Sequence, residues 1–140
     1  MNMKFYCCTL LLLLSSILAD AQVIVTKDVD YMNDSVYDNG KDLLDIYMPQ
    51  GKKNVPVIVY FHGGALLMGD KSLGESIGNK IAESGIGLVS VNYRLSPEFQ
   101  HPTHVNDAAA AAAWVIKNID GYGGNPQKVY VGGHSAGAYL

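Results

Sequence analysis

The sequence predicts an α/β fold, in which a mainly parallel β-sheet has helices on both faces. β-Rich segments alternate with helical ones along the chain, which is the order of strands linked by crossover helices. The segment 55–61, VPVIVYF, is apolar throughout, as in a strand buried on both faces of a sheet. The 140 residues are 49% hydrophobic and 16% charged, which is typical of one globular domain.

The first two strands are predicted to form a hairpin. The segments 23–31 and 43–47 are β-rich, and Asn39-Gly40 between them is a tight-turn signal. Pro49 ends the second strand, and the apolar strand at 55–61 follows.

Helices and strands then alternate. Apolar residues recur at helical spacing over 72–84, where a glycine follows as a stop signal. The segment 86–95 is again β-rich. A helix is predicted over 103–119, because the six alanines at its centre favour a helix and let it approach the sheet closely. Residues 128–131 form the last predicted strand, and a helix is expected to begin at Ser135.

Residues 1–21 are predicted to be a cleavable secretory signal peptide. Lys4 gives a positive start, the segment 5–18 is mostly apolar, and Ala19-Asp20-Ala21 is an A-x-A cleavage pattern. The apolar run is shorter than the roughly 20 residues of a membrane-spanning helix, so no stable membrane anchor is expected. The mature domain is therefore 22–140, in a secreted or periplasmic protein.

Composition excludes several function classes. The net charge of −3 includes no basic block, so no nucleic-acid partner is expected. Both cysteines lie in the signal segment, which leaves the mature domain without thiol chemistry. Glu75 and Glu83 share a predicted helix without a histidine, and no metal site is predicted. The segment GALLMGDKS, residues 64–72, is close to a phosphate-binding P-loop, but Asp70 interrupts the pattern. No cofactor is expected.

The segment VGGHSAG, residues 131–137, places one serine between two glycines directly after a β-rich run. In a G-x-S-x-G strand–turn–helix the serine lies at the tip of a sharp, strained turn, and glycines avoid collisions with the neighbouring strand and helix. Ser135 would then stand clear of the carboxyl edge of the sheet. The amide of Ala136 would face outward from a helix N-terminus, where it favours a developing oxyanion. The alternative is an ordinary strand-to-helix loop.

A second glycine-rich segment, FHGGA, follows the apolar strand directly at residues 61–65. Two glycines at the end of a strand let backbone amides face a substrate without side chains in between. An HGGG-type loop supplies the other half of an oxyanion hole in this way.

Residues 42–140 resemble the amino-terminal half of an α/β hydrolase of the carboxylesterase/lipase group, which includes hormone-sensitive-lipase-like and acetyl-xylan or feruloyl esterase-like enzymes. The segments that carry the resemblance are LLDIYMP, VIVYFHGGALLMGDK, VSVNYRLSPE and YGGNPQKVYVGGHSAGAYL. The resemblance implies an α/β-hydrolase fold that is truncated after the nucleophile elbow. Ala65-Leu66 departs from the family, where glycine or an aromatic residue is common, and this leaves the shape of the acyl pocket open.

The resemblance also implies the site residues. Ser135 would be the nucleophile, and the amides of Gly63, Gly64 and Ala136 would form the oxyanion hole, while His62 would order the oxyanion loop. The expected activity is hydrolysis of a carboxylic ester that is a small molecule or is linked to a carbohydrate. An amidase, an arylformamidase, an exopeptidase on the same scaffold and a non-catalytic binding module are the alternatives.

The acid and the histidine of a catalytic triad are expected beyond Leu140. In this fold they follow the nucleophile in the chain, which disfavours His62 as the base, and only five residues follow Ser135. Without a base the serine hydroxyl is a weak nucleophile, so this chain by itself is expected to be incomplete and inactive. His134, next to the nucleophile, is expected to pack behind the turn.

The other polar residues singled out are given structural roles. His101 and His104 are expected at the surface or at a helix cap. Arg94 is expected to pair with Asp70 or Asp107 and so to brace the loops, and a binding site for a substrate carboxylate is the alternative.

Overall fold

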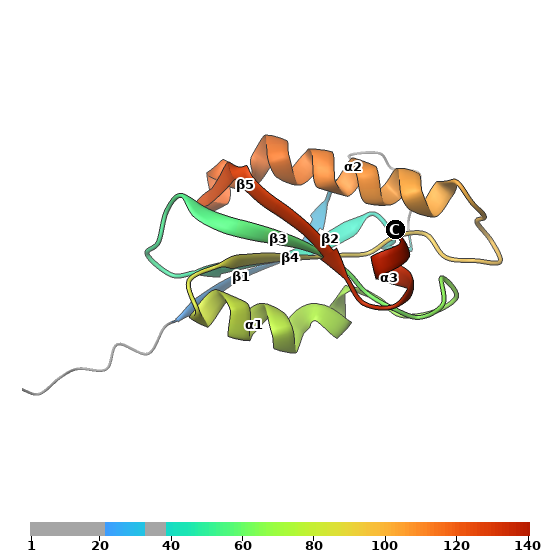
Figure 1. Cartoon of the computed structure of the whole chain (residues 1–140), viewed down its shortest axis with the longest axis horizontal. Coiled ribbons are helices and arrows are strands. Elements are labelled where there is room, and N and C mark those ends of the chain that lie inside the picture. Colours follow the sequence, from blue (N-terminus) through green and yellow to red (C-terminus); the bar gives the residue numbers. More distant parts are fainter. Residues whose placement is uncertain (1–21, 33–38) are drawn as a thin grey trace, which may run out of the picture.

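A computed structural model describes residues 22–32 and 39–140. The predicted signal peptide, residues 1–21, lies outside the described residues. Five strands form one sheet, and α1 and α2 cover its opposite faces (Figure 1). The strands are β1 (Val23–Asp30), β2 (Leu43–Pro49), β3 (Val55–Phe61), β4 (Gly87–Val91) and β5 (Gly124–Gly133). The helices are α1 (Glu75–Glu83), α2 (Thr103–Asn118) and α3 (Ala136–Tyr139), with the 3₁₀ turns η1 (Lys71–Gly74) and η2 (Ile119–Tyr122). In the described part of the chain, no helix has the length and apolar character needed to span a bilayer.

The sheet order is β1-β2-β4-β3-β5, and the predicted elements are all present. β1 and β2 pair antiparallel, which confirms the predicted hairpin, while β3 pairs parallel with both β4 and β5. Asp30 lies opposite Leu43, so the hairpin link is longer than a two-residue turn. Asn39-Gly40 lies near the end of this link, where Gly40 has a φ of +71°.

Strand β3 differs from the prediction that it is buried on both faces. Its residues alternate between buried and partly buried, and Val57, Val59 and Phe61 point to the fully buried face. The opposite side chains, which include Ile58 and Tyr60, are only partly covered. The uniform apolar composition therefore predicts a strand inside the sheet but not how completely helices cover its second face.

The alanine-rich helix α2 packs closely on the sheet, as predicted, and it covers the fully buried face. Ala108, Ala111 and Val115 are buried there and belong to the same hydrophobic cluster as Val57 and Val59. Small side chains let the helix axis approach the strands closely, which leaves little space at this contact.

Arg94 pairs with Asp107, one of the two predicted partners. The Arg94 amide and Nε donate to Asp107 Oδ2 at 3.0 and 2.8 Å, and Arg94 Nη2 donates to Oδ1. Asp107 is fully buried. This bidentate pair ties the segment after β4 to α2, which favours the structural role over a substrate site.

Candidate active site

Ser135 lies in a strained turn between β5 and α3, as the glycine pattern predicts. Its φ of +52° and ψ of −117° lie outside the conformations that a residue with a side chain commonly adopts. Such a conformation costs about 1–3 kcal/mol and persists only where the surrounding structure enforces it. The amide of His134 donates to the carbonyl of Phe61 at 3.1 Å, which fixes the turn to the end of β3. Ser135 itself is exposed.

The two glycines of the G-x-S-x-G pattern allow this turn to close. A Cβ on Gly133 would overlap the backbone of Gly137 and would come within 2.7 Å of the Ala138 amide nitrogen. A Cβ on Gly137 would overlap the carbonyl of Phe61 at the end of β3. The predicted collisions with helix and strand are therefore confirmed. A Cβ on Gly132, by contrast, would meet nothing closer than 3.8 Å.

The second glycine-rich segment lies directly beside this turn. A Cβ on Gly63 would be 3.3 Å from the Cβ of Ser135 and 2.7 Å from His134 Nδ1. Because β3 and β5 are parallel neighbours, their carboxyl ends bring these two segments together. The structure thus places Gly63 next to Ser135, although the two are far apart in the sequence.

Residues 62–70, which we call the oxyanion loop after the role that the sequence predicts for it, turn sharply after Gly63. Gly64 has a φ of +128°, and its carbonyl accepts hydrogen bonds from the amides of Leu67 and Met68 at 2.9 and 3.1 Å. Ala65 and Leu66 have φ values of +55° and +62°. Ala65 therefore keeps the left-handed backbone that glycine adopts most easily, so its departure from the family pattern leaves the turn intact.

Three backbone amides in or next to the two glycine-rich segments have no backbone acceptor among the described residues. The amide of Ala136 opens α3 and has no acceptor within that helix. Within the described residues, the amides of Gly63 and Gly64 donate to no backbone carbonyl. A cavity of about 560 Å³ is lined by Gly63 and Gly64 together with Met68 and His134, while Ser135 and Ala136 lie outside its lining.

His62 lies buried beneath the oxyanion loop. Its Nδ1 is 2.7 Å from the carbonyl of Gly63, and since a carbonyl only accepts, Nδ1 carries the proton. Its ring stacks on Tyr93 with centroids 4.4 Å apart, and the Tyr93 hydroxyl donates to the His62 carbonyl at 2.7 Å. Burial lowers the pKa of His62, which keeps the ring neutral at pH 7. A neutral ring bonded to Gly63 is suited to ordering the loop.

Two of the other histidines differ from their predicted surroundings. His134 is exposed rather than packed behind the turn, because its side chain lies against Gly63, which has no side chain to cover it. His104 is buried rather than at the surface, and its Nε2 is 3.2 Å from Ser96 Oγ. His101 is exposed, as expected.

Sequence reasoning missed a polar cluster that holds the far end of the oxyanion loop. It is centred on Lys71, which contacts Asp45 of β2 and Asn92 just after β4. Asp45 was detectable in principle, since a carboxylate within an otherwise apolar β-strand is seldom buried unless it is paired. Its partner was not, because Lys71 lies in the turn η1 and reaches Asp45 only through the tertiary arrangement of the chain.

A family profile and similar proteins match the chain. The profile of the BD-FAE family matches residues 44–140. A probable isoprenylcysteine alpha-carbonyl methylesterase of Oryza sativa subsp. japonica is 36% identical over 104 residues, which is 74% of this chain and 25% of that protein. Carboxylesterase NlhH of Mycobacterium tuberculosis is 36% identical over 107 residues, which is 74% of this chain and 34% of that protein.

Solved structures share the fold. A truncated form of a carbohydrate esterase from gut microbiota superposes with a TM-score of 0.75 at 29% identity, covering 85% of this chain and 42% of that one. The chain spans about a quarter to two fifths of the length of these matched proteins. The sheet order and the helices on both faces are those of the α/β-hydrolase fold.

Proposed function

The chain belongs to the BD-FAE family, and on that premise we propose that it serves as a serine hydrolase of carboxylic esters. The observation that carries this proposal is the position of the strained, exposed Ser135 beside Gly63. A hydroxyl next to free backbone amides is the arrangement that acyl transfer requires.

In the proposed mechanism Ser135 Oγ attacks the carbonyl carbon of the ester while a histidine takes its proton. The carbonyl π electrons move onto oxygen, and the amides of Gly63, Gly64 and Ala136 donate hydrogen bonds to this oxyanion. When the tetrahedral intermediate collapses, the bond to the alcohol breaks and the histidine returns the proton to the leaving alkoxide. Water then releases the acid by the same steps. Loss of one oxyanion donor typically lowers the rate by about 10²–10³-fold.

We place the catalytic acid and histidine in a part of the full-length protein outside this chain. The matched relatives are about two to three times as long as this chain. Within the described residues, β5 pairs with β3 alone, and Tyr130 and Val131 on it are 59% and 64% exposed. Such exposed apolar side chains on a strand are consistent with further protein packing against β5.

The proposed substrate is a small-molecule ester or an ester attached to a carbohydrate. Similar proteins are named as carboxylesterases, a methylesterase and a carbohydrate esterase, so they share the ester bond but not the alcohol. An amidase, an arylformamidase or an exopeptidase on the same scaffold, or a non-catalytic binding module, is the competing function.

Active-site labelling and a substrate panel test this function. We expect a fluorophosphonate probe to modify the full-length protein at Ser135, as located by mass spectrometry of the labelled peptide. We also expect p-nitrophenyl and methyl esters to be hydrolysed faster than the matching anilides. Faster anilide cleavage would assign the protein to the amidases, and a protein that is neither labelled nor active would be a binding module.

We also propose that the protein is exported after removal of residues 1–21. The sequence of that segment supports the proposal, because a positive start, a short apolar run and an A-x-A pattern are the features that signal peptidase reads. Amino-terminal sequencing of the secreted or periplasmic protein should begin at Gln22. A mature protein that still begins at Met1 would contradict export by this route.

A further inference from the structure

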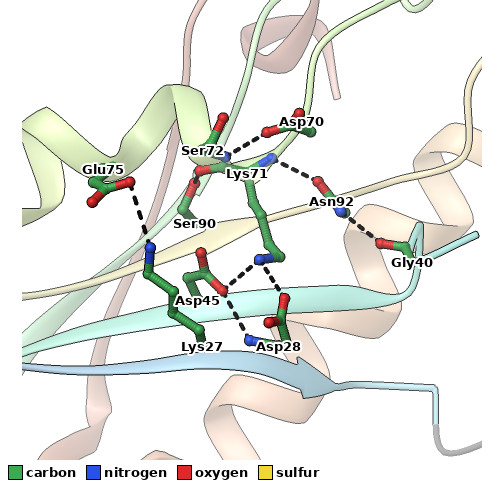
Figure 2. Close-up of polar contacts among 10 residues, drawn as sticks. All are labelled: Lys27, Asp28, Gly40, Asp45, Asp70, Lys71, Ser72, Glu75, Ser90 and Asn92. Atoms are coloured by element: carbon green, nitrogen blue, oxygen red, sulfur yellow. Dashed lines mark hydrogen bonds and ion pairs between the residues drawn. The ribbon is translucent and has the colours of Figure 1, made fainter.

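The oxyanion loop returns to the sheet at Lys71, and four neighbours hold this residue (Figure 2). Its Nζ is 2.6 Å from Asp45 Oδ1 and 2.7 Å from Asp28 Oδ1. Its amide donates to Asn92 Oδ1 at 2.6 Å, and its carbonyl accepts from Ser90 Oγ at 2.7 Å. These partners belong to β1, β2, β4 and the residue just after β4. Both the backbone and the side chain of Lys71 are therefore fixed to the sheet.

The ion pair at the centre of this cluster is largely buried. The Lys71 side chain is 13% exposed and that of Asp45 is 3% exposed. Burial alone would lower the pKa of Lys71, but hydrogen bonds to Asp28 and Asp45 raise it overall, so the ammonium stays charged. Asp45 Oδ1 also accepts the amide of Asp28 at 2.9 Å. A buried charge-assisted contact of this kind resists screening by salt and holds one geometry.

A short path of close contacts leads from Lys71 to the oxyanion amides. Gly69, two residues before Lys71, has a φ of +99° and lies against His62 and Gly63. A Cβ on Gly69 would be 2.7 Å from His62 Nδ1 and 2.9 Å from the Gly63 carbonyl oxygen. Because so little space separates them, a shift of Lys71 moves Gly69 and with it the peptide of Gly63.

We propose that Lys71, held by Asp45, is a positioning residue for ester hydrolysis. It fixes the oxyanion loop so that the amides of Gly63 and Gly64 stay aimed at the oxygen of the tetrahedral intermediate on Ser135. The proposal rests on the proposed function, since it assigns to Lys71 a role in that same site. Catalytic donors must be held within about 0.5 Å of their working geometry, which is why an anchor outside the site affects the rate.

The test compares Lys71 with a second lysine that forms only a surface ion pair. In the full-length protein, the double variant Lys71→Met and Asp45→Asn removes the ion pair without leaving a buried unpaired charge. We expect kcat for p-nitrophenyl acetate to fall by about 10–100-fold while KM changes by less than about 3-fold, because the amides act mainly on the transition state. The single variant Lys71→Arg keeps the positive charge, so its kcat should lie between those of the double variant and the unmodified protein.

Lys27→Met is the matched control. Lys27 pairs with Glu75 at 3.6 Å, and both side chains are about half exposed, so its kcat should stay within about 2-fold of the unmodified protein. Amide hydrogen exchange in the peptide 62–70 should quicken in the double variant and in Lys71→Met, but not in Lys27→Met. This measurement reports the anchor without reference to activity.

The outcomes separate the two proposals. If Ser135→Ala removes hydrolysis but the folded double variant keeps kcat within about 2-fold, the positioning role is overturned and the proposed function stands. If Ser135→Ala leaves hydrolysis intact, the proposed function fails and the positioning role fails with it, even where exchange in 62–70 shows that Lys71 anchors the loop. A fall in kcat equal for Lys71→Met and Lys27→Met would also overturn the positioning role.

Discussion

Replacing Ser135 by alanine in the full-length protein is expected to lower kcat/KM for p-nitrophenyl acetate by at least about 10⁴-fold. The variant keeps the amides that surround the oxyanion but has no oxygen to attack the carbonyl, so only the residual effect of binding and electrostatics remains. Stopped-flow or plate assays of p-nitrophenolate release measure this loss. Fluorophosphonate labelling should disappear in the same variant.

Ser84→Ala is the control for this experiment. Ser84 is exposed after the end of α1, where its hydroxyl donates to the Ile81 carbonyl at 2.6 Å. Removal of the Ser84 hydroxyl affects only the C-terminal end of α1, which has no proposed part in catalysis, so kcat should be unaffected. Retention of more than a tenth of the activity by Ser135→Ala would show that another group is the nucleophile.

The folded state of Ser135→Ala should be about as stable as the unmodified protein. The φ of +52° at this position is unfavourable for either side chain, so the substitution neither relieves nor adds backbone strain. A loss of activity without a loss of stability therefore assigns the effect to chemistry. Urea denaturation of both proteins checks this point.

Local sequence patterns predicted the strands, the helices and the elbow because these features depend on neighbours in the chain. Gly133 and Gly137 show this clearly, since their spacing around Ser135 predicted the two steric contacts that the structure contains. The alanine run of α2 likewise predicted a helix packed closely on the sheet. The fold class followed from the order of these elements.

Several features that depend on distant segments were not predicted. The partly covered face of β3 depends on where α1 lies, and the exposure of His134 depends on its contact with Gly63. The register of β2 and β4 places Asp45 opposite Ser90, and Ser90 holds the Lys71 carbonyl, so Lys71 and Asp45 meet through a long-range pairing. A single sequence contains the residues of such contacts but not the pairing that brings them together.

The turn at Ser135 also predicts that Gly132 of β5 and Gly137 of α3 differ strongly in how well they tolerate a side chain. Gly137→Ala is expected to lower the free energy of unfolding by about 3 kcal/mol or more, because the new Cβ overlaps the Phe61 carbonyl, and backbone cannot swing aside as a flexible side chain can. Relief of this overlap would push α3 away from β3 and would displace the amide of Ala136. Ester hydrolysis should therefore fall together with stability, by about 10²-fold or more.

Gly132→Ala is the matched control, one residue outside the G-x-S-x-G pattern. Its Cβ would meet only Ile58 Cγ2, at 3.8 Å, which is an ordinary contact. We expect the free energy of unfolding to change by less than about 1 kcal/mol, and an increase is reasonable because alanine restricts the unfolded chain. Urea denaturation and kcat for both variants of the full-length protein measure the difference. Equal losses of stability and kcat at positions 132 and 137 would mean that the close approach of α3 to the end of β3 does not shape the turn at Ser135. The assignment of Ala136 to the oxyanion hole would then lose its structural basis.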